Sequence, residues 1–258
     1  MRIIIPTRGR KARQITLQSL PRELRKRTTI VCPGTEVVRL QCLDDDVEVV
    51  AQPDSNWRIA QKRAWIVREF VQRGYNKIMM LDDDLSFATR ISAGGTGLRE
   101  IHGKELIKEF QRIEDKLGPA YPHVGFGPRQ GNHAEDGGWK SPGRMMYTLG
   151  YYLPVAKECR WDLLEFREDL CVTLQLLLKG YPNAIWTKTV VDQRDNAPGG
   201  CSTYRTVVMS DAEADRFVQL YPNYVSVIQR DYATSLPRKE VVVQWKKALE
   251  DGRSSSTR

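Results

Sequence analysis

The feature that most constrains the fold is an alternation of short apolar runs and helical patterns in the first ninety residues. Apolar runs cover residues 3–5, 29–32, 47–50 and 77–81, and turns that contain proline end the first three. Such short runs between turn residues are typical of buried strands. Helical patterns cover 14–24 and 58–73. Strands that alternate with helices predict an α/β fold with a mostly parallel sheet flanked by helices.

The helix expected over 58–73 has an apolar stripe made of Ala60, Ala64, Val67 and Val71, with Gly74 at its end. Asp54, Ser55 or Asn56 is expected to cap its start. Further along, the patterns predict helices over 103–117, 168–179, 211–219 and 238–249, strands over 123–127 and 184–191, and extended chain over 145–155. The glycine-rich stretch 128–143 is expected to be a mobile loop, and 251–258 a flexible tail. No linker divides the chain, so 1–250 is predicted to be one domain.

Length and composition exclude several classes of protein. The chain of 258 residues can bury a full core. It has no apolar run near the roughly 18 residues of a membrane span, and its N-terminus does not resemble a signal peptide. Five scattered cysteines without a CxxC pair indicate reduced thiols. We therefore expect a cytoplasmic protein with no membrane partner, in the host cytoplasm if the chain is viral.

The positive charge is concentrated at the N-terminus. The net charge is +8, and residues 1–27 contain nine basic side chains but only one acid, Glu23. This segment is either a solvated helix face or an edge that faces phosphate groups.

The apolar run 77–81 leads directly into Asp82, Asp83 and Asp84. Adjacent carboxylates repel each other unless a cation neutralises them, and ligands gather at the carboxyl ends of parallel strands. In extended chain, Asp82 and Asp84 would point to one side and Asp83 to the other. This pattern predicts that Asp82 and Asp84 bind a divalent ion together with substrate phosphates. The alternative is an acidic surface turn, which is the role expected for the same tripeptide at 44–46.

Two further segments offer polar groups near the ends of predicted strands. Thr7, Arg8 and Arg10 follow the first strand, where forked guanidinium donors can bind phosphate, although a basic surface loop is the alternative. Asp54 follows the third strand and either accepts from a base or ribose or simply caps the next helix.

Glu168 and Asp169 begin a predicted helix, where the helix dipole favours the ionised carboxylate. An ionised carboxylate beside an acceptor hydroxyl is a general base. We favour Asp169 over Glu168 for this role, and capping without chemistry is the alternative.

Aromatic and basic residues are interleaved in the second half of the chain, as at Trp139-Lys140 and Tyr204-Arg205. Proteins hold an extruded base with this combination of stacking and phosphate contact. We therefore expect a polyanionic acceptor, such as a nucleic acid, to be bound by Arg129, Trp139, Lys140 and Arg144. His133, Asp192 and Asp195 are additional polar candidates whose roles stay open.

Taken together, the opening Ile3-Ile4-Ile5-Pro6-Thr7-Arg8-Gly9-Arg10, the helix that begins Trp57-Arg58-Ile59-Ala60 and the strand that ends in Asp82-Asp83-Asp84 resemble nucleotide-sugar glycosyltransferases of the GT-A fold. The segment Phe166-Arg167-Glu168-Asp169-Leu170 is similar to the helix start that carries the catalytic base in inverting members. The resemblance covers roughly 1–90 and 145–190.

The resemblance implies a GT-A fold in which 1–90 bind the nucleotide sugar and 91–250 bind the acceptor. It implies that the donor is held by Pro6, Thr7, Arg8, Arg10, Asp54, Arg58, Lys62, Asp82 and Asp83. It also implies that Asp82 and Asp84 hold Mn²⁺ or Mg²⁺ on the donor diphosphate. A uridine-diphosphate sugar is the donor that we expect first.

A narrower resemblance concerns 123–132 and Asn196-Ala197-Pro198-Gly199-Gly200-Cys201-Ser202, which look like phage-type glycosyltransferases proposed to act on hydroxymethylated DNA bases. We therefore expect a metal-dependent glycosyltransferase whose acceptor is a 5-hydroxymethylpyrimidine in DNA. The alternatives are a nucleotidyltransferase or pyrophosphorylase, and a DNA-binding module without enzymatic activity.

Overall fold

The computed structural model describes residues 1–10, 13–129, 135–193, 199–232 and 235–256. The strands are β1 (Arg2–Pro6), β2 (Thr28–Cys32), β3 (Glu48–Ala51), β4 (Lys77–Leu81), β5 (Leu85–Arg90), β6 (Leu98–Glu100), β7 (His123–Pro128), β8 (Trp139–Lys140), β9 (Thr148–Tyr152), β10 (Asn183–Gln193), β11 (Val225–Tyr232) and β12 (Ser235–Val243). The helices are α1 (Ile15–Ser19), α2 (Arg22–Arg25), η1 (Gly34–Glu36), α3 (Val37–Gln41), α4 (Ile59–Gln72), α5 (Gly103–Lys116), α6 (Leu153–Ala156), α7 (Glu168–Leu178), η2 (Gly200–Thr203), α8 (Val207–Leu220) and α9 (Trp245–Ser256).

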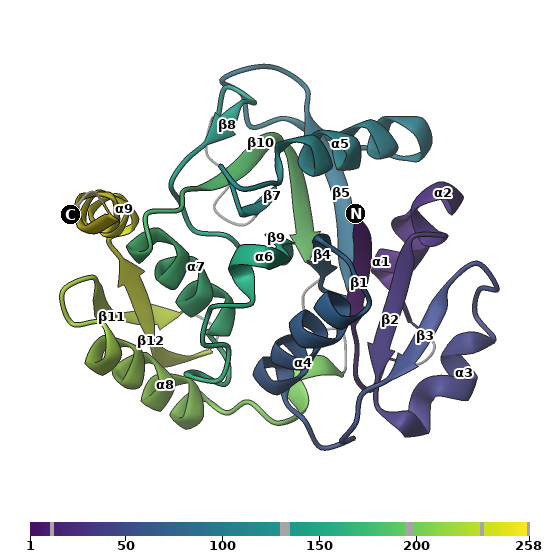
Figure 1. The fold of residues 1–258 in the computed structure, drawn as a ribbon, viewed down its shortest axis with the longest axis horizontal. Helices are drawn as coiled ribbons and strands as arrows, with labels where there is room; N and C mark the ends of the chain where they lie inside the picture. Colours follow the sequence, from purple (N-terminus) through teal and green to yellow (C-terminus); the bar gives the residue numbers. More distant parts are fainter. Residues whose placement is uncertain (11–12, 130–134, 194–198, 233–234, 257–258) are drawn as a thin grey trace.

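The central sheet has the strand order β3-β2-β1-β4-β9-β7-β10-β5-β6, and β8 pairs with β10 outside this path (Figure 1). Strands β3, β2, β1 and β4 pair in parallel, with Ile4 opposite both Thr29 and Met80. Strand β9 is antiparallel to β4 and β7, and β10 is parallel to β7. The carboxyl ends of β1 to β4, β7 and β10 therefore lie along one edge. The predicted α/β class is confirmed.

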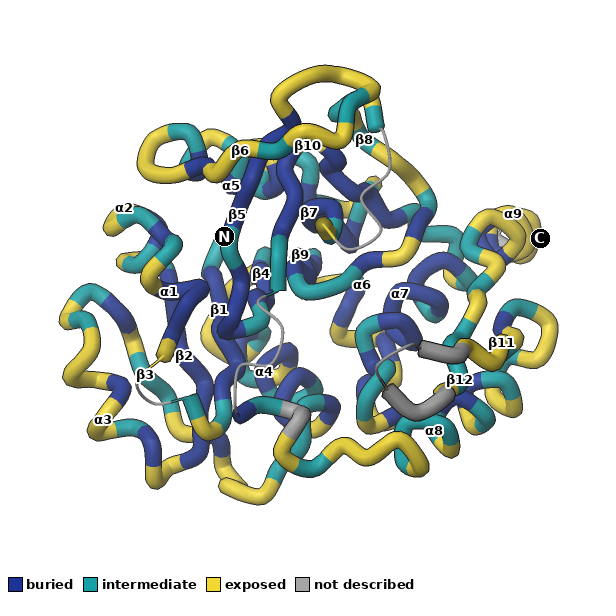
Figure 2. Tube along the Cα trace, turned by 180° about the vertical axis from the view of Figure 1, so that it is seen from behind, coloured by how far each residue is buried: buried dark blue, intermediate teal, exposed yellow. Residues whose placement is uncertain are grey.

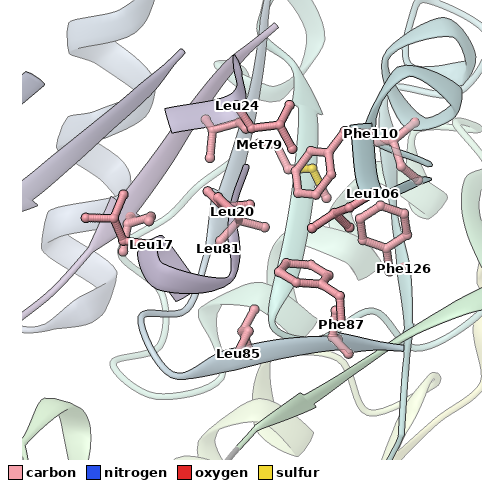
Figure 3. Packing of buried hydrophobic residues seen from close by; sticks show 14 of the residues in the cluster. Leu17, Leu20, Leu24, Met79, Leu81, Leu85, Phe87, Leu106, Phe110 and Phe126 are labelled. Carbon is pink, nitrogen blue, oxygen red and sulfur yellow. The ribbon is translucent and has the colours of Figure 1, made fainter. Parts of the chain in front are cut away.

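Side chains of the central strands alternate between two cores. Ile3 and Ile5 of β1 face the cluster beneath α1, α2, α3 and α5, whereas Ile4 faces the cluster beneath α4, α6 and α7. In the first cluster, the rings of Phe87, Phe110 and Phe126 meet edge to face (Figure 3). Figure 2 shows β1 and β4 buried along the middle of the molecule. Helices on both faces explain why these strands are apolar throughout.

The chain after residue 206 forms what we call the C-terminal unit: α8, the hairpin β11-β12 and α9 (Figure 1). A third apolar cluster joins this unit to α7 through Leu170, Leu174, Leu177, Phe217 and Leu249. Because α7 contributes to both this cluster and the second core, the unit is part of the same domain. Within the described ranges, no helix is long and apolar enough to cross a membrane.

Three predicted elements differ from the structure. The helix expected over 14–24 is divided into α1 and α2, because Pro21 is extended and precedes a new helix start. Of the stretch 145–155, which was expected to be extended, only β9 is a strand, and α6 follows it directly. The helix expected over 238–249 is wrong: β-branched Val241 to Val243 continue β12, and α9 extends from Trp245 through most of the predicted tail.

The predicted mobile loop at 128–143 is only partly described, since 130–134 lie outside the described residues. Its described part includes β8 and ends at Gly143, which is bonded to Asn183 of β10 through both its N–H and its carbonyl.

His123, at the start of β7, gives the fold a defined response to acid. The ring is fully buried and stacks on Tyr151 with centroids 4.4 Å apart. Its Nδ1 donates to the Gly150 carbonyl at 2.9 Å, and Nε2 lies 3.1 Å from the Thr173 hydroxyl. Burial lowers the pKa of His123 from 6.5 to about 4, despite the bond to Gly150. The unfolded chain therefore binds this proton at a higher pH than the folded chain.

We expect the free energy of unfolding to decrease as the pH falls from about 6.5 to about 4, by roughly 3 kcal/mol from this residue alone. Urea unfolding at several pH values measures the slope. His123→Gln cannot take up the proton, so its slope in this range should be smaller than that of the wild type. Equal slopes in the two proteins would contradict the prediction.

Candidate functional site

Asp82, Asp83 and Asp84 form a turn between β4 and β5 at the carboxyl edge of the sheet. Thr16 of α1 holds this turn: its hydroxyl donates to the Asp82 carbonyl at 2.5 Å and accepts from the Leu85 N–H at 2.8 Å. The Thr16 N–H donates to the Asp83 carbonyl at 3.2 Å. Backbone groups that would otherwise be buried without partners are thereby satisfied, and the three carboxylates are fixed.

The carboxylates do not alternate as predicted, because they belong to a turn and not to extended chain. Asp83 accepts from Thr7 and Arg10. Asp84 lies 2.8 Å from the same Arg10 guanidinium and accepts from Gln193 Nε2 at 3.2 Å. Asp82 instead turns to Arg63. Asp83 and Asp84 therefore share the guanidinium of Arg10, whereas Asp82 pairs with that of Arg63.

Arg63 of α4 joins the strand end to the start of α7. Its Nη2 lies 2.8 Å from Asp82 and its Nη1 lies 2.5 Å from Glu168. The guanidinium is buried. Two buried atoms, Nε of Arg63 and Oε2 of Glu168, have no hydrogen-bond partner in the described residues. Burial alone would lower the pKa of Arg63, but Glu168 and Asp82 outweigh it and raise the pKa. This arginine fixes Asp82 relative to Asp169, the next residue after Glu168.

Among the described residues, the carboxyl groups of the site outnumber the guanidiniums that pair with them. Burial raises the pKa of Asp82 to about 7, and repulsion from Asp84 and Asp83 adds to this effect while Arg63 opposes it. Burial likewise raises the pKa of Glu168 to about 7, against the attraction of Arg63. With Asp169, five carboxyl groups face the guanidiniums of Arg10 and Arg63. A bound cation would relieve this imbalance.

The described part of the chain contains no group of three His, Cys, Asp or Glu side chains arranged to hold a metal. Asp82, with a quarter of its side chain exposed, and the buried Asp84 are the two predicted ligands, and each of them pairs with an arginine in the structure. Two carboxylates that leave the other positions to water and phosphate are a donor set that suits Mg²⁺ or Mn²⁺. The residues therefore fit a divalent ion bound jointly with a substrate diphosphate.

The loop after β1 borders the carboxylate turn. The Gly9 N–H donates to both oxygens of the buried Glu36, at 3.0 and 3.1 Å, with a backbone φ of +74° that glycine adopts without strain. Lys62 is buried and donates to the Thr7 carbonyl at 2.7 Å. Pro6 ends β1, so it precedes this loop. Arg8 donates to the Trp57 carbonyl at 3.3 Å and directs its guanidinium toward the Tyr204 ring.

Asp54 and Arg58 differ from the predicted capping arrangement. Asp54 accepts from the Asn56 N–H at 2.8 Å in a turn before the helix. Helix α4 begins after Arg58, whose N–H donates to Gln61 Oε1 at 2.9 Å. The Arg58 guanidinium pairs with Glu165 in the segment before α7. Arg58 therefore links the start of α4 to the segment before α7, and Asp54 does not cap the helix.

Glu168 and Asp169 have different surroundings at the start of α7. Glu168 is buried and paired with Arg63. Asp169 is half-buried, and its carboxylate accepts from the Leu170 N–H at 2.8 Å. Of the two, Asp169 is more accessible to a substrate.

The predicted acceptor residues are not all brought together. Arg129 follows the carboxyl end of β7, and its guanidinium pairs with Asp192 at 2.7 Å. Trp139 and Lys140 pair with Trp186 and Ile185, near the opposite end of β10. Arg144 is exposed and follows Gly143, which is bonded to the first residue of β10. His133 and Asp195 lie outside the described residues.

The basic N-terminal segment is largely neutralised. Five of its arginines pair with acids: Arg2 with Glu48, Arg10 with Asp83 and Asp84, Arg22 with Asp46, Arg25 with Asp44, and Arg27 with Glu114. The Asp44-Asp45-Asp46 tripeptide is the turn that was predicted. Most of the N-terminal positive charge is thus used within the protein.

Sequence reasoning missed Arg63 and Gln193. The buried face of α4 consists of Ala60, Lys62, Arg63, Ile66, Val67 and Phe70, so it is rotated from the predicted stripe. Arg63 is three residues after Ala60 and four before Val67, which is a core position. A charged residue at a core position of an amphipathic helix indicates a buried partner, and this signal could have identified it. Gln193 gave no such signal.

The solved structures that are similar to this chain include the following three. Mannose-1-phosphate geranyltransferase from Thermus thermophilus is 12% identical, with 74% of this chain and 57% of that chain covered and a TM-score of 0.38. A197 from STIV is 15% identical, with 74% and 84% covered and a TM-score of 0.42. A putative nucleotide-diphospho-sugar transferase from Desulfovibrio desulfuricans is 15% identical, with 65% and 72% covered and a TM-score of 0.37.

A search of curated proteins gave no match. The model of the TET-associated glycosyltransferase family matches residues 1–200, which include the carboxylate turn, Arg63 and the start of α7. The chain therefore belongs to the TET-associated glycosyltransferase family and is a glycosyltransferase.

Proposed function

We propose that the protein transfers a sugar from a nucleoside-diphosphate sugar to the hydroxyl of a 5-hydroxymethylpyrimidine in DNA, with Mn²⁺ or Mg²⁺ as cofactor. The observation that carries the proposal is the link from Asp82 through Arg63 to the start of α7. It joins a carboxylate suited to a metal-bound diphosphate to a helix start that presents Asp169.

On the donor side, Asp82 and Asp84 would hold the metal ion, and Thr7, Arg8 and Arg10 border the same turn. The ion, when bound, supplies Lewis-acid stabilisation of the leaving diphosphate. Arg8 has no carboxylate partner in the described residues, so its guanidinium is available to a phosphate. Lys62 positions the loop, since its ammonium group is bonded to the Thr7 carbonyl.

On the acceptor side, Asp169 accepts the proton of the hydroxymethyl group as its oxygen bonds to the anomeric carbon. The bond from that carbon to the diphosphate breaks at the same time, and the diphosphate leaves with the electron pair. Asp169 is suited to this role because it is half-buried at a helix N-terminus, where the dipole favours the ionised form. Attack from the side opposite the diphosphate inverts the anomeric centre.

Two observations support a DNA acceptor over a free sugar. The net charge is +8, which favours a polyanion. The described residues also place the aromatic rings of Phe166 and Tyr204 close together, and Phe166 is three residues before Asp169 in the chain. Rings beside the base are what a nucleobase acceptor requires.

The test is to incubate the enzyme with a panel of nucleotide sugars, manganese, and duplexes with or without 5-hydroxymethylated pyrimidines. The DNA is then digested and its nucleosides are weighed by mass spectrometry. We expect a sugar-sized mass increase only on the hydroxymethylated base, loss of that product with a chelator, and its return with Mn²⁺ or Mg²⁺. Labelling of a lipid, protein or small sugar in place of DNA would refute the acceptor, and transfer unaffected by the chelator would refute the metal.

A further inference from the structure

The acceptor residues expected from sequence are spread along the sheet, but another group includes Phe166, which is three residues before Asp169 in the chain. Phe166 precedes α7, and Tyr204 follows η2. Their ring centroids are 5.8 Å apart with an angle of 30° between the planes. Both residues are only partly buried, so the pair retains accessible ring surface.

Two arginines complete this group, which we call the Tyr204 cluster: Phe166, Tyr204, Arg8 and Arg58. The guanidinium carbons of Arg8 and Arg58 lie 5.8 and 5.5 Å from the Tyr204 ring centroid. Two like charges over one ring repel each other, and only Arg58 has an acidic partner, Glu165, in the described residues. The cluster therefore combines a ring surface with excess positive charge, which is complementary to a base attached to phosphates.

The cluster is held by contacts from several parts of the chain. Glu213 of α8 accepts from the N–H groups of Glu165 and Phe166, at 2.8 and 3.4 Å. Arg167 donates to the carbonyls of Ser210 and Lys239, at 2.7 and 3.3 Å.

The segment that carries Tyr204 is fixed to the loop after β1. The Gly200 N–H donates to the Arg8 carbonyl at 2.8 Å. A side chain at Gly199 would come within 2.8 Å of Arg10, so this close approach requires glycine. Because both ring-bearing segments are anchored, binding need not order them first.

We propose that the Tyr204 cluster is the acceptor-base site: Phe166 and Tyr204 stack on a pyrimidine extruded from the duplex, and Arg58 contacts a flanking phosphate. Arg8, over the same ring, is the arginine that contacts the donor diphosphate. This rests on the proposed function, because it specifies where that acceptor binds. Since Phe166 is three residues from Asp169, the site places the hydroxymethyl group near the general base. The other possible occupant, the base of the donor nucleotide, is an outcome of the test.

The experiment compares Tyr204→Ala, Phe166→Ala and Tyr204→Phe with the wild type, measuring KM for the hydroxymethylated duplex and KM for the donor separately. We expect each alanine variant to raise the KM for the duplex by about 10- to 100-fold, since each loses a stacking partner. Tyr204→Phe keeps the ring and should recover most of the affinity. Tyr75→Ala, which removes a partly exposed ring packed on Phe70 at the end of α4, is the matched control.

The outcomes separate the two proposals. A rise in the KM for the donor, with the duplex KM unchanged, would assign the cluster to the donor base and overturn the inference. Unchanged values of both would also overturn it, while transfer to DNA by the wild type would leave the proposed function intact. If the wild type hydrolyses a donor but modifies no hydroxymethylated duplex, the proposed acceptor fails, and the cluster's role fails with it.

Discussion

Replacing Asp169 with asparagine is expected to lower the rate of sugar transfer by about 10²- to 10⁴-fold, with donor binding retained. Asparagine has nearly the same shape as aspartate but cannot take the proton of the acceptor hydroxyl. The fold should be unaffected, because Asp169 is half-buried and its carboxylate bonds only to the Leu170 N–H among the contacts in the described chain. The loss should therefore be in kcat and not in affinity for the donor.

The measurement is kcat at saturating donor and acceptor, together with donor affinity from thermal shift. Asp162→Asn is the control. Asp162 is an exposed acid that precedes the same helix, and in the described residues it pairs only with Arg160. A variant at Asp169 that turns over normally but binds donor weakly would place this carboxylate in the donor site. Glu168 would then be the remaining acid at the helix start.

Replacing Arg63 with methionine is expected to decrease the free energy of unfolding by about 3–5 kcal/mol. Methionine fills much of the same space but leaves Asp82 and Glu168 close together and buried without their shared cation. Removing one member of a buried charge group costs this much because the remaining charges stay desolvated. Transfer should also fall, since Asp82 loses its fixed position relative to Asp169.

Urea unfolding of Arg63→Met and of Arg68→Met provides the comparison. Arg68 is an exposed arginine of the same helix, so its replacement should change the unfolding free energy by less than about 0.5 kcal/mol. Adding Glu168→Gln to Arg63→Met removes one of the stranded charges and should restore part of the lost stability. Equal losses for the two single variants would show that the buried ion pairs contribute nothing.

The sequence predicted the α/β class because its strongest signals are local. Strand β4 and helices α4, α5 and α7 lie within a residue or two of their predicted bounds, since a short apolar run or a helical period specifies each one. The family resemblance was also confirmed, because its motifs lie on these elements. The order Asp169 before Glu168 remains a prediction, which their unequal burial supports.

What sequence did not predict depends on contacts between distant segments. Strand β5 was not predicted, because it begins at Leu85, immediately after the aspartates that form the turn, and no proline or glycine marks its start. Val241 to Val243 fit either a helix or a strand until β11 pairs with them. The role of Arg63 required knowing that Glu168, more than a hundred residues later, lies on the same side of the sheet as Asp82.

The support of the α7 start by Ser210, Glu213 and Lys239 has a consequence for how such an enzyme can diversify. The match to the family ends at residue 200, before all three of these residues. The carboxylates of the proposed donor site are held by α1, α4 and β10, whereas the segment before the proposed general base, Asp169, is held by the C-terminal unit as well as by Arg63. With the roles proposed above, substitutions in that unit would alter which acceptor is used while the donor chemistry stays the same, so the two substrates of one reaction could evolve separately.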